Sequence, residues 1–265
     1  MAVIDTETDE IIRMFETGPL PKMVATSPDG TRLAVTHWGN NTIGLLDISS
    51  DEPADWHYIT SLIVDYQLKL NLSRTVSVDR DVNSGYCLRG TVFTPDGHYL
   101  LVGCMGGGGG IAVIDLTTNR YLGRAMGVLP NLRHLIIKNG YLFGSINRTG
   151  HIERIALQDF LDQMSVLDGD KHKSVTINNW EKCKIPAGAA GGRVTVHLDL
   201  RGDADLLDPG EQFVRTVRQR NRLPAIDKAG DEITSGQRRC RDKKRGTGDK
   251  NAKGFLHISS RISSL

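Results

Sequence analysis

A repeat of about 42 residues is the feature that most limits what this chain can fold into. Asp5 and Asp47, which end equivalent segments, are 42 positions apart, and the turn glycines Gly97 and Gly140 are 43 apart. The copies occupy residues 2–17 (in part), 18–48, 89–116 and 127–157. Repeats of this length are typical of β-propellers, in which each unit is one four-stranded blade.

Each copy contains the signals of short strands joined by tight turns. Residues 24–26 lead into the turn Ser27-Pro28-Asp29-Gly30, where proline, aspartate and glycine each suit one turn position. Second and third strands are predicted at 32–36 and 42–46, and residues 10–15 predict a fourth. The sequence therefore predicts an all-β fold, a β-propeller of four-stranded blades that is incomplete, with about four blades.

The repeat predicts blades over residues 1–188, with insertions at about 49–86 and 158–178. Apolar residues in 160–167 have helical spacing, and residues 179–185 predict an outer strand. Residues 189–265 hold 16 basic and 10 acidic residues, whereas residues 1–188 hold 17 and 21. We expect this irregular, basic segment to be a degenerate blade or a disordered tail, or else not the native continuation of the blades.

Three runs of this sequence resemble the YVTN-type β-propeller repeat of YncE-like proteins and of archaeal surface-layer and surface-antigen proteins. The runs are IDTETDEII, GPLPKMVATSPDGTRLAVTHWGNNTIGLLDI and IAVIDLTTNRYLG, and Ala34-Val35-Thr36-His37 loosely matches the namesake tetrapeptide. The similarity covers roughly residues 2–48 and 86–157. It implies a ring of seven blades in the family, and a surface protein that binds other molecules.

Candidate ligand-binding residues gather at the predicted mouth of the central channel. Basic residues recur near the start of each first strand, and two histidines and a further arginine are expected on the same face. The set is Lys22, His37, Arg89, Arg133, His134 and Arg148. Such cations could hold carboxylate or phosphate, or they could be solvated residues of the mouth. We find no carboxylate pair beside them and so assign no catalytic residue.

The midpoint between two cysteines, at 95.5, falls on the turn at residues 95–97, so we expect Cys87 and Cys104 to be cross-strand neighbours. They could form a disulfide in an oxidising compartment, or they could be small buried residues. No His/Cys/Asp cluster has the spacing of a metal site, and the Gly106–Gly110 run lacks the Gly-Lys-Ser/Thr ending of a phosphate loop. We expect no metal and no cofactor.

Two functions are compatible with these features. The first is a non-catalytic binding or scaffold propeller, whose partner is an unknown protein or a small anionic ligand at the channel mouth. The alternative resembles the propeller lactonases, hydrolases that here would act on a small anionic sugar lactone and would need an inward carboxylate. The basic run at 237–253 has almost no aromatic residues to stack bases, so we do not expect a nucleic-acid ligand.

The compartment is left open by the sequence. No run of about 18 apolar residues predicts a membrane span. Residues 1–20 show no secretory signal, which would suggest the cytoplasm, whereas the family resemblance implies the periplasm or the cell surface. Because the first copy of the repeat is partial, we expect an open sheet edge and a tendency to aggregate.

Overall fold

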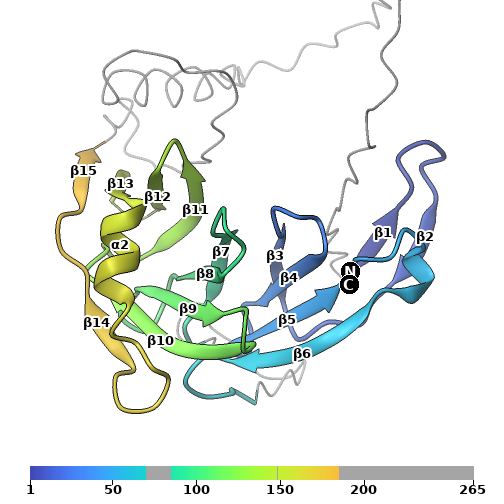
Figure 1. Ribbon diagram of the computed structural model, residues 1–265, viewed down its shortest axis with the longest axis horizontal. Helices are drawn as coiled ribbons and strands as arrows, with labels where there is room; N and C mark the ends of the chain where they lie inside the picture. Colours follow the sequence, from blue (N-terminus) through green and yellow to red (C-terminus); the bar gives the residue numbers. More distant parts are fainter. Residues whose placement is uncertain (70–84, 148, 185–265) are drawn as a thin grey trace, which may run out of the picture.

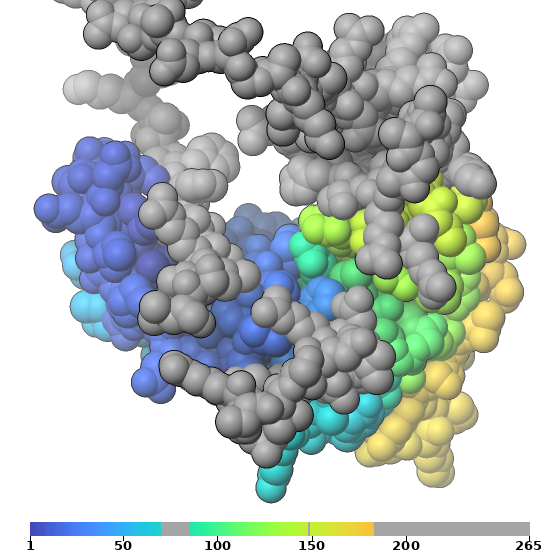
Figure 2. Space-filling model, turned by 180° about the vertical axis from the view of Figure 1, so that it is seen from behind, coloured from blue at the N-terminus to red at the C-terminus, as the bar shows by residue number. Residues whose placement is uncertain are grey.

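The computed structural model describes residues 1–69, 85–147 and 149–184, which form four β-sheets along an arc (Figure 1). Sheet 1 has two strands, and sheets 2 to 4 each have a core of four antiparallel strands, in the manner of propeller blades. In Figure 2 the N-terminal sheet in blue and the sheet-4 end in yellow lie on opposite sides of the molecule. The predicted all-β fold of four-stranded blades is confirmed for these residues.

The strand bounds follow the order of the chain, from the inner to the outer strand of each sheet. Sheet 1 contains β1 (Ala2–Ile4) and β2 (Ile11–Met14). Sheet 2 contains β3 (Pro21–Thr26), β4 (Arg32–His37), β5 (Thr42–Asp47) and β6 (His57–Ile63). Sheet 3 contains β7 (Leu88–Phe93), β8 (Tyr99–Cys104), β9 (Ile111–Asp115), β10 (Arg120–Met126) and β14 (Ser174–Thr176). Sheet 4 contains β11 (Leu132–Lys138), β12 (Tyr141–Ile146), β13 (His151–Ala156) and β15 (Glu181–Lys184).

The same turn chemistry closes the first hairpin of sheets 2 and 3. The Ser27 hydroxyl donates to Asp29, the Thr94 hydroxyl donates to Asp96, and both turns end on a left-handed glycine. A side chain that bonds its own turn favours the bend over an extended chain. The tetrad therefore fixes the hairpin register in both copies.

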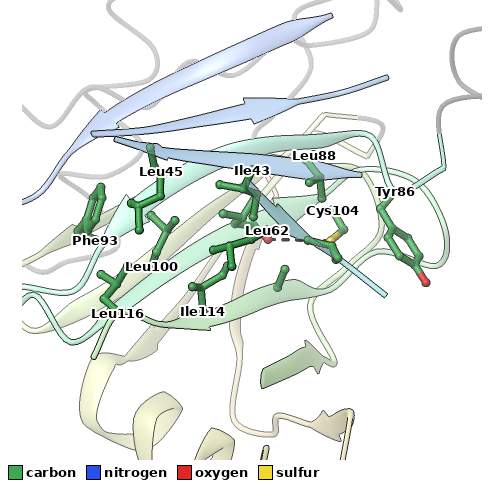
Figure 3. Close-up of a cluster of buried hydrophobic side chains, with 14 residues drawn as sticks. Ile43, Leu45, Leu62, Tyr86, Leu88, Phe93, Leu100, Cys104, Ile114 and Leu116 are labelled. Carbon is green, nitrogen blue, oxygen red and sulfur yellow. Dashed lines mark hydrogen bonds between the residues drawn. The ribbon is translucent and has the colours of Figure 1, made fainter. Parts of the chain in front are cut away.

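Three hydrophobic cores lie between successive sheets. Leu33, Val35 and Leu46 of sheet 2 pack with Val3 of sheet 1 and with Phe15, the residue after β2. The second core, drawn in Figure 3, lies between sheets 2 and 3 and is lined by residues such as Ile43, Leu45, Leu100 and Ile114. The third lies between sheets 3 and 4 and includes Leu101, Val113, Leu142 and Phe160. Because side chains alternate along a strand, each central strand contributes to the cores on both of its faces.

The two expected insertions contain secondary structure. Residues 49–86 include the short helix η1 (Pro53–Asp55) and β6, the outer strand of sheet 2, so this stretch is in part a blade strand. Residues 158–178 include most of α2 (Leu157–Met164) and β14, which adds to sheet 3 in parallel with β10. The expected outer strand at 179–185 corresponds to β15. Residues 189–265 lie outside the described residues.

The innermost strands β3, β7 and β11 approach one another closely. A Cβ on Gly90 of β7 would lie 2.8 Å from the backbone nitrogen of Leu135 in β11, so glycine permits this contact. On the other side, the Thr36 hydroxyl lies 3.5 Å from the Arg89 carbonyl oxygen. This convergence brings the starts of the three inner strands together.

Candidate functional site

The structure places three of the predicted cations at equivalent positions of neighbouring sheets. Lys22, Arg89 and Arg133 are the second residues of β3, β7 and β11, and each is partly buried. We call them the cation row. Trp38, which follows β4, joins two of them: its ring centroid lies 5.2 Å from Lys22 Nζ and 5.8 Å from Arg89 Cζ. The aromatic face favours a cation at such distances.

Burial and mutual repulsion shape the electrostatics of this row. Burial, and then the positive charge of Arg133, hold the pKa of Arg89 below its ordinary value. Burial also lowers the pKa of Arg133, which donates a hydrogen bond to Asn147 at 3.3 Å. Arg89 Nε is buried and has no hydrogen-bond partner among the described residues. Since both guanidinium groups stay charged near neutral pH, an anion placed between them would relieve the repulsion.

His37 differs from the expectation of a cation at the mouth. Its side chain is 3% exposed, and its Nδ1 lies 2.7 Å from the Thr42 hydroxyl. That hydroxyl donates to Asn40, so it accepts the proton of His37 Nδ1. Burial lowers the pKa of His37 to about 4, which leaves the ring neutral. A buried neutral imidazole adds no positive charge to the row, and a role for His37 in ligand binding stays a prediction.

The other two predicted residues contribute less than the row. His134, the third residue of β11, is 8% exposed and its backbone packs against Gly90 of β7. It therefore lies between two inner strands and not on an open surface. Arg148 lies outside the described residues.

The two cysteines are both buried free thiols, and the register differs from the sequence prediction. Cys104 pairs with Leu88, and the carbonyl of Cys87 accepts from Met105 at 3.4 Å. Near the turn Phe93 pairs with Leu100, a register that would place Arg89 opposite Cys104. The shift between Leu88 and Thr91 moves that pairing by one residue, to Leu88, and Cys87 remains one residue beyond it. Burial raises the pKa of Cys104 to about 12, so its thiol is unreactive at neutral pH.

Sequence reasoning missed a polar network at the outer side of sheet 3. Asp65, just after β6, accepts hydrogen bonds from the hydroxyls of Tyr86 (2.8 Å) and Tyr121 (2.9 Å) and pairs with Arg124 at 3.3 Å. The Arg124 guanidinium also stacks over the Tyr86 ring at 4.2 Å. No signal in the sequence marked Asp65, because it lies in the stretch assigned to an insertion. Both oxygens of its carboxylate are engaged by these donors, which join β10 to the segments before β7 and after β6.

The glycine-rich loop at Gly106–Gly110 is held in place by Arg124 of this polar network. The carbonyl oxygens of Gly107 and Gly109 each accept from Arg124 at 3.1 Å. A Cβ on Gly107 would lie 2.2 Å from the Tyr86 ring, so the loop packs tightly on that side chain. A phosphate loop presents backbone N–H groups to its ligand, whereas here carbonyl groups bind an arginine. The expectation of a connecting loop is therefore supported.

The described part of the chain lacks two features that would point to other functions. It contains no group of three His, Cys, Asp or Glu residues placed to hold a metal ion. Its helices include none that is long and apolar enough to cross a membrane.

Comparisons with known proteins give distant structural similarity. No protein-family model matches the chain. No curated protein matches it. Among solved structures, hydrazine synthase of Kuenenia stuttgartiensis aligns with a TM-score of 0.39 and 15% identity over 56% of this chain and 36% of its own. A functionally unknown protein from Desulfotomaculum acetoxidans aligns with a TM-score of 0.44 and 12% identity, over 57% of this chain and 41% of its own. U3-55K aligns with a TM-score of 0.39 and 10% identity, over 54% of this chain and 38% of its own.

The aligned part of the chain spans about two fifths of the length of these structures. The similarities are to β-propeller proteins and concern the fold alone. The sheet order and register carry the fold assignment, and the cation row is the feature from which a function can be argued.

Proposed function

We propose that this protein is a non-catalytic β-propeller that binds an anionic ligand, carrying carboxylate or phosphate, at the cation row. The observation that carries the proposal is Arg89. Its guanidinium is partly buried, its pKa is lowered by burial and by the like charge of Arg133, and its Nε has no hydrogen-bond partner among the described residues. A bidentate anion would supply the hydrogen bonds and the opposite charge.

Trp38 also orients two side chains of the cation row. Trp38 packs beneath Lys22 and Arg89, and it is 7% exposed, so it fixes the direction of both side chains. A cation held by an aromatic face loses less side-chain entropy when it binds a ligand. The row is therefore organised for a charged group before the ligand arrives.

The lactonase alternative requires a carboxylate that faces the ligand. The buried Glu153 of sheet 4 accepts from the backbone of Leu129 at 2.8 Å and lies 3.4 Å from Lys182. Asp65 accepts from two tyrosine hydroxyls and pairs with Arg124. Both carboxylates already have a basic or hydrogen-bonding partner within the sheets, although Glu153 Oε1 accepts no hydrogen bond from the described residues. These partners favour binding without turnover.

Membership of the YVTN-type repeat family and a place in the cell envelope form the finer part of the proposal. The three sequence runs and the shared turn chemistry of residues 27–30 and 94–97 support it. An anion-binding ring at the cell surface would suit capture of acidic sugars or acidic protein segments.

The test is isothermal titration of the full chain with inorganic phosphate and with citrate. Arg89→Gln should weaken binding by about tenfold, the loss of one charge-assisted hydrogen bond of ~1.4 kcal/mol. Arg120→Gln is the matched control, because Arg120 is exposed on the outer strand β10 beside Asp170. Equal affinities of the wild type and Arg89→Gln would overturn the proposal. Hydrolysis of 6-phosphogluconolactone above background would favour the lactonase instead.

A further inference from the structure

A cavity of about 280 Å³ lies where sheet 1 meets β3, at one end of the arc (Figure 1). Two of the residues that line it, Val24 and Val35, pair across β3 and β4 and contact the core between sheets 1 and 2. Val35 is buried, whereas Ile11 and Met14 of β2, which also line the cavity, are exposed. The cavity therefore runs from a buried floor to a rim that solvent reaches.

The walls of this cavity are apolar and adaptable. Apart from Lys22, the described residues that line it have apolar side chains, among them Ala2 and Ile4 of β1. Several are methionines, such as Met14 and Met23, whose unbranched side chains adjust to the shape of a ligand. Apolar walls give water few hydrogen-bond partners, so an apolar group is favoured there over water. The cavity therefore suits an aliphatic chain.

Lys22 connects this cavity to the cation row. It lines the cavity, and its Nζ lies 5.2 Å from the ring centroid of Trp38, the aromatic residue that Arg89 also approaches. A lysine can border an apolar space with its methylene stem while its ammonium group reaches a neighbour outside that space. A molecule in the cavity would therefore meet positive charge at one end and apolar walls along the rest. Ligand pockets of proteins combine apolar walls and a few polar groups in the same way.

We propose that the ligand of the cation row is an amphipathic carboxylate, whose head group lies at Lys22 and whose aliphatic tail fills the cavity between sheet 1 and β3. The position of the head group rests on the proposed function, and the cavity adds the class of ligand. The negative head group complements the charge of the row, and the tail is removed from water by the apolar walls. Phosphate or citrate uses the head-group position alone.

Isothermal titration of the full chain with acetate, butyrate and hexanoate tests the tail. Each methylene group that enters the cavity should tighten binding by about fourfold, because its burial removes apolar surface from water. Hexanol has the same tail without the charge, and it should bind about tenfold more weakly than hexanoate. Equal affinities for hexanoate and acetate overturn the inference, and so does hexanol that binds as tightly as hexanoate.

Two variants of the walls show whether the tail lies in this cavity. Ala2→Leu takes up part of the volume from β1, so it should reduce the ratio of the hexanoate affinity to the acetate affinity severalfold. Ala54→Leu is the matched control, because Ala54 is exposed in η1. Met14→Gln makes the exposed rim polar without crowding β1, and it should reduce the same ratio. A ratio that neither wall variant changes overturns the inference.

Variants of the row separate this inference from the proposed function. Lys22→Gln should weaken hexanoate binding by about tenfold, and a variant that binds hexanoate like the wild type overturns the inference. If phosphate binding depends on Arg89 but chain length gives no gain, the proposed function stands and the inference fails. If the gain with chain length depends on Lys22 but Arg89→Gln binds every anion like the wild type, the proposed function fails and the inference stands. A second copy of this chain in the cavity would exclude the tail, so hexanoate would bind no tighter than acetate, which also overturns the inference.

Discussion

His37 shows how one buried side chain can set the pH response of the fold. Its ring is held by Thr42 and packs against Gly18, where a Cβ would lie 2.6 Å from Nδ1. The hydrogen bond favours the charged form, but desolvation outweighs it, and the pKa falls from 6.5 to about 4. The unfolded chain therefore binds this proton more readily than the folded chain.

The pH dependence follows from that difference with a fixed sign. Above about pH 6.5 the ring is neutral in both states, and as the pH falls towards 4 the unfolded state alone gains the proton. The free energy of unfolding should thus fall by about 3 kcal/mol between pH 6.5 and 4. Urea denaturation across this range measures it, and His37→Gln should flatten the slope. A wild-type slope that His37→Gln leaves unchanged would assign the effect to other groups.

At the scale of elements, local chemistry accounts for most of what the sequence predicted correctly. The turn tetrads, the helical spacing before Leu167 and the outer strand after Trp180 are encoded by neighbouring residues, so a single sequence reveals them. The register shift at Arg89 and Gly90 and the parallel addition of β14 depend on contacts between distant strands. No local pattern carries that information. Cys87 is misplaced because the sequence prediction centres the hairpin at 95.5, whereas Phe93 pairs with Leu100 and the turn is centred one residue later.

The candidate site likewise has one part that the sequence predicts and one part that only the tertiary structure shows. The recurrence of a basic residue at the start of each inner strand predicted Lys22, Arg89 and Arg133, and the structure brings Lys22 and Arg89 to one tryptophan and Arg133 to the side of Arg89. Burial depends on tertiary packing, so the sequence could not show that His37 lies inside the fold.

The contact between the inner strands β7 and β11 gives a prediction at this scale. Gly90→Ala places a methyl group 2.8 Å from the Leu135 nitrogen, and a backbone atom cannot turn aside as a side chain can. Overpacking of this kind should lower the free energy of unfolding by about 1–3 kcal/mol. Because β7 must move, the same variant should also weaken anion binding at the cation row. Denaturant melts and titration measure the two effects.

Gly97→Ala provides the comparison for that variant. Gly97 has a φ of 71°, and no atom lies within 4 Å of the position that an alanine methyl group would take, so the change adds only backbone strain of about 1 kcal/mol. It should leave anion binding unchanged. Equal effects of the two variants on binding would show that the approach of β7 to β11 does not position the row.

For the whole molecule, the two ends of the described arc differ in how their apolar surface is covered. Sheet 1 has two strands where the others have at least four, and the described residues place no strand along the free edge of β1. A cavity of about 280 Å³ lies between sheet 1 and β3, lined by residues such as Met1, Ile11 and Met23. On β2, Ile11 is 63% exposed and Met14 66%. An open strand edge beside apolar side chains favours pairing with another chain.

We therefore expect the purified chain to self-associate through sheet 1 as its concentration rises. Ile11→Lys should shift the association to higher concentration, because a charge at the edge must be desolvated when a second chain docks. Val166→Lys is the matched control, since Val166 is 52% exposed and follows α2. Figure 1 shows α2 at the opposite end of the arc from sheet 1. Sedimentation velocity over a dilution series measures the effect. A wild type that stays monomeric throughout, or an equal response to Val166→Lys, would show that the edge of sheet 1 is protected and that its exposed side chains do not drive association.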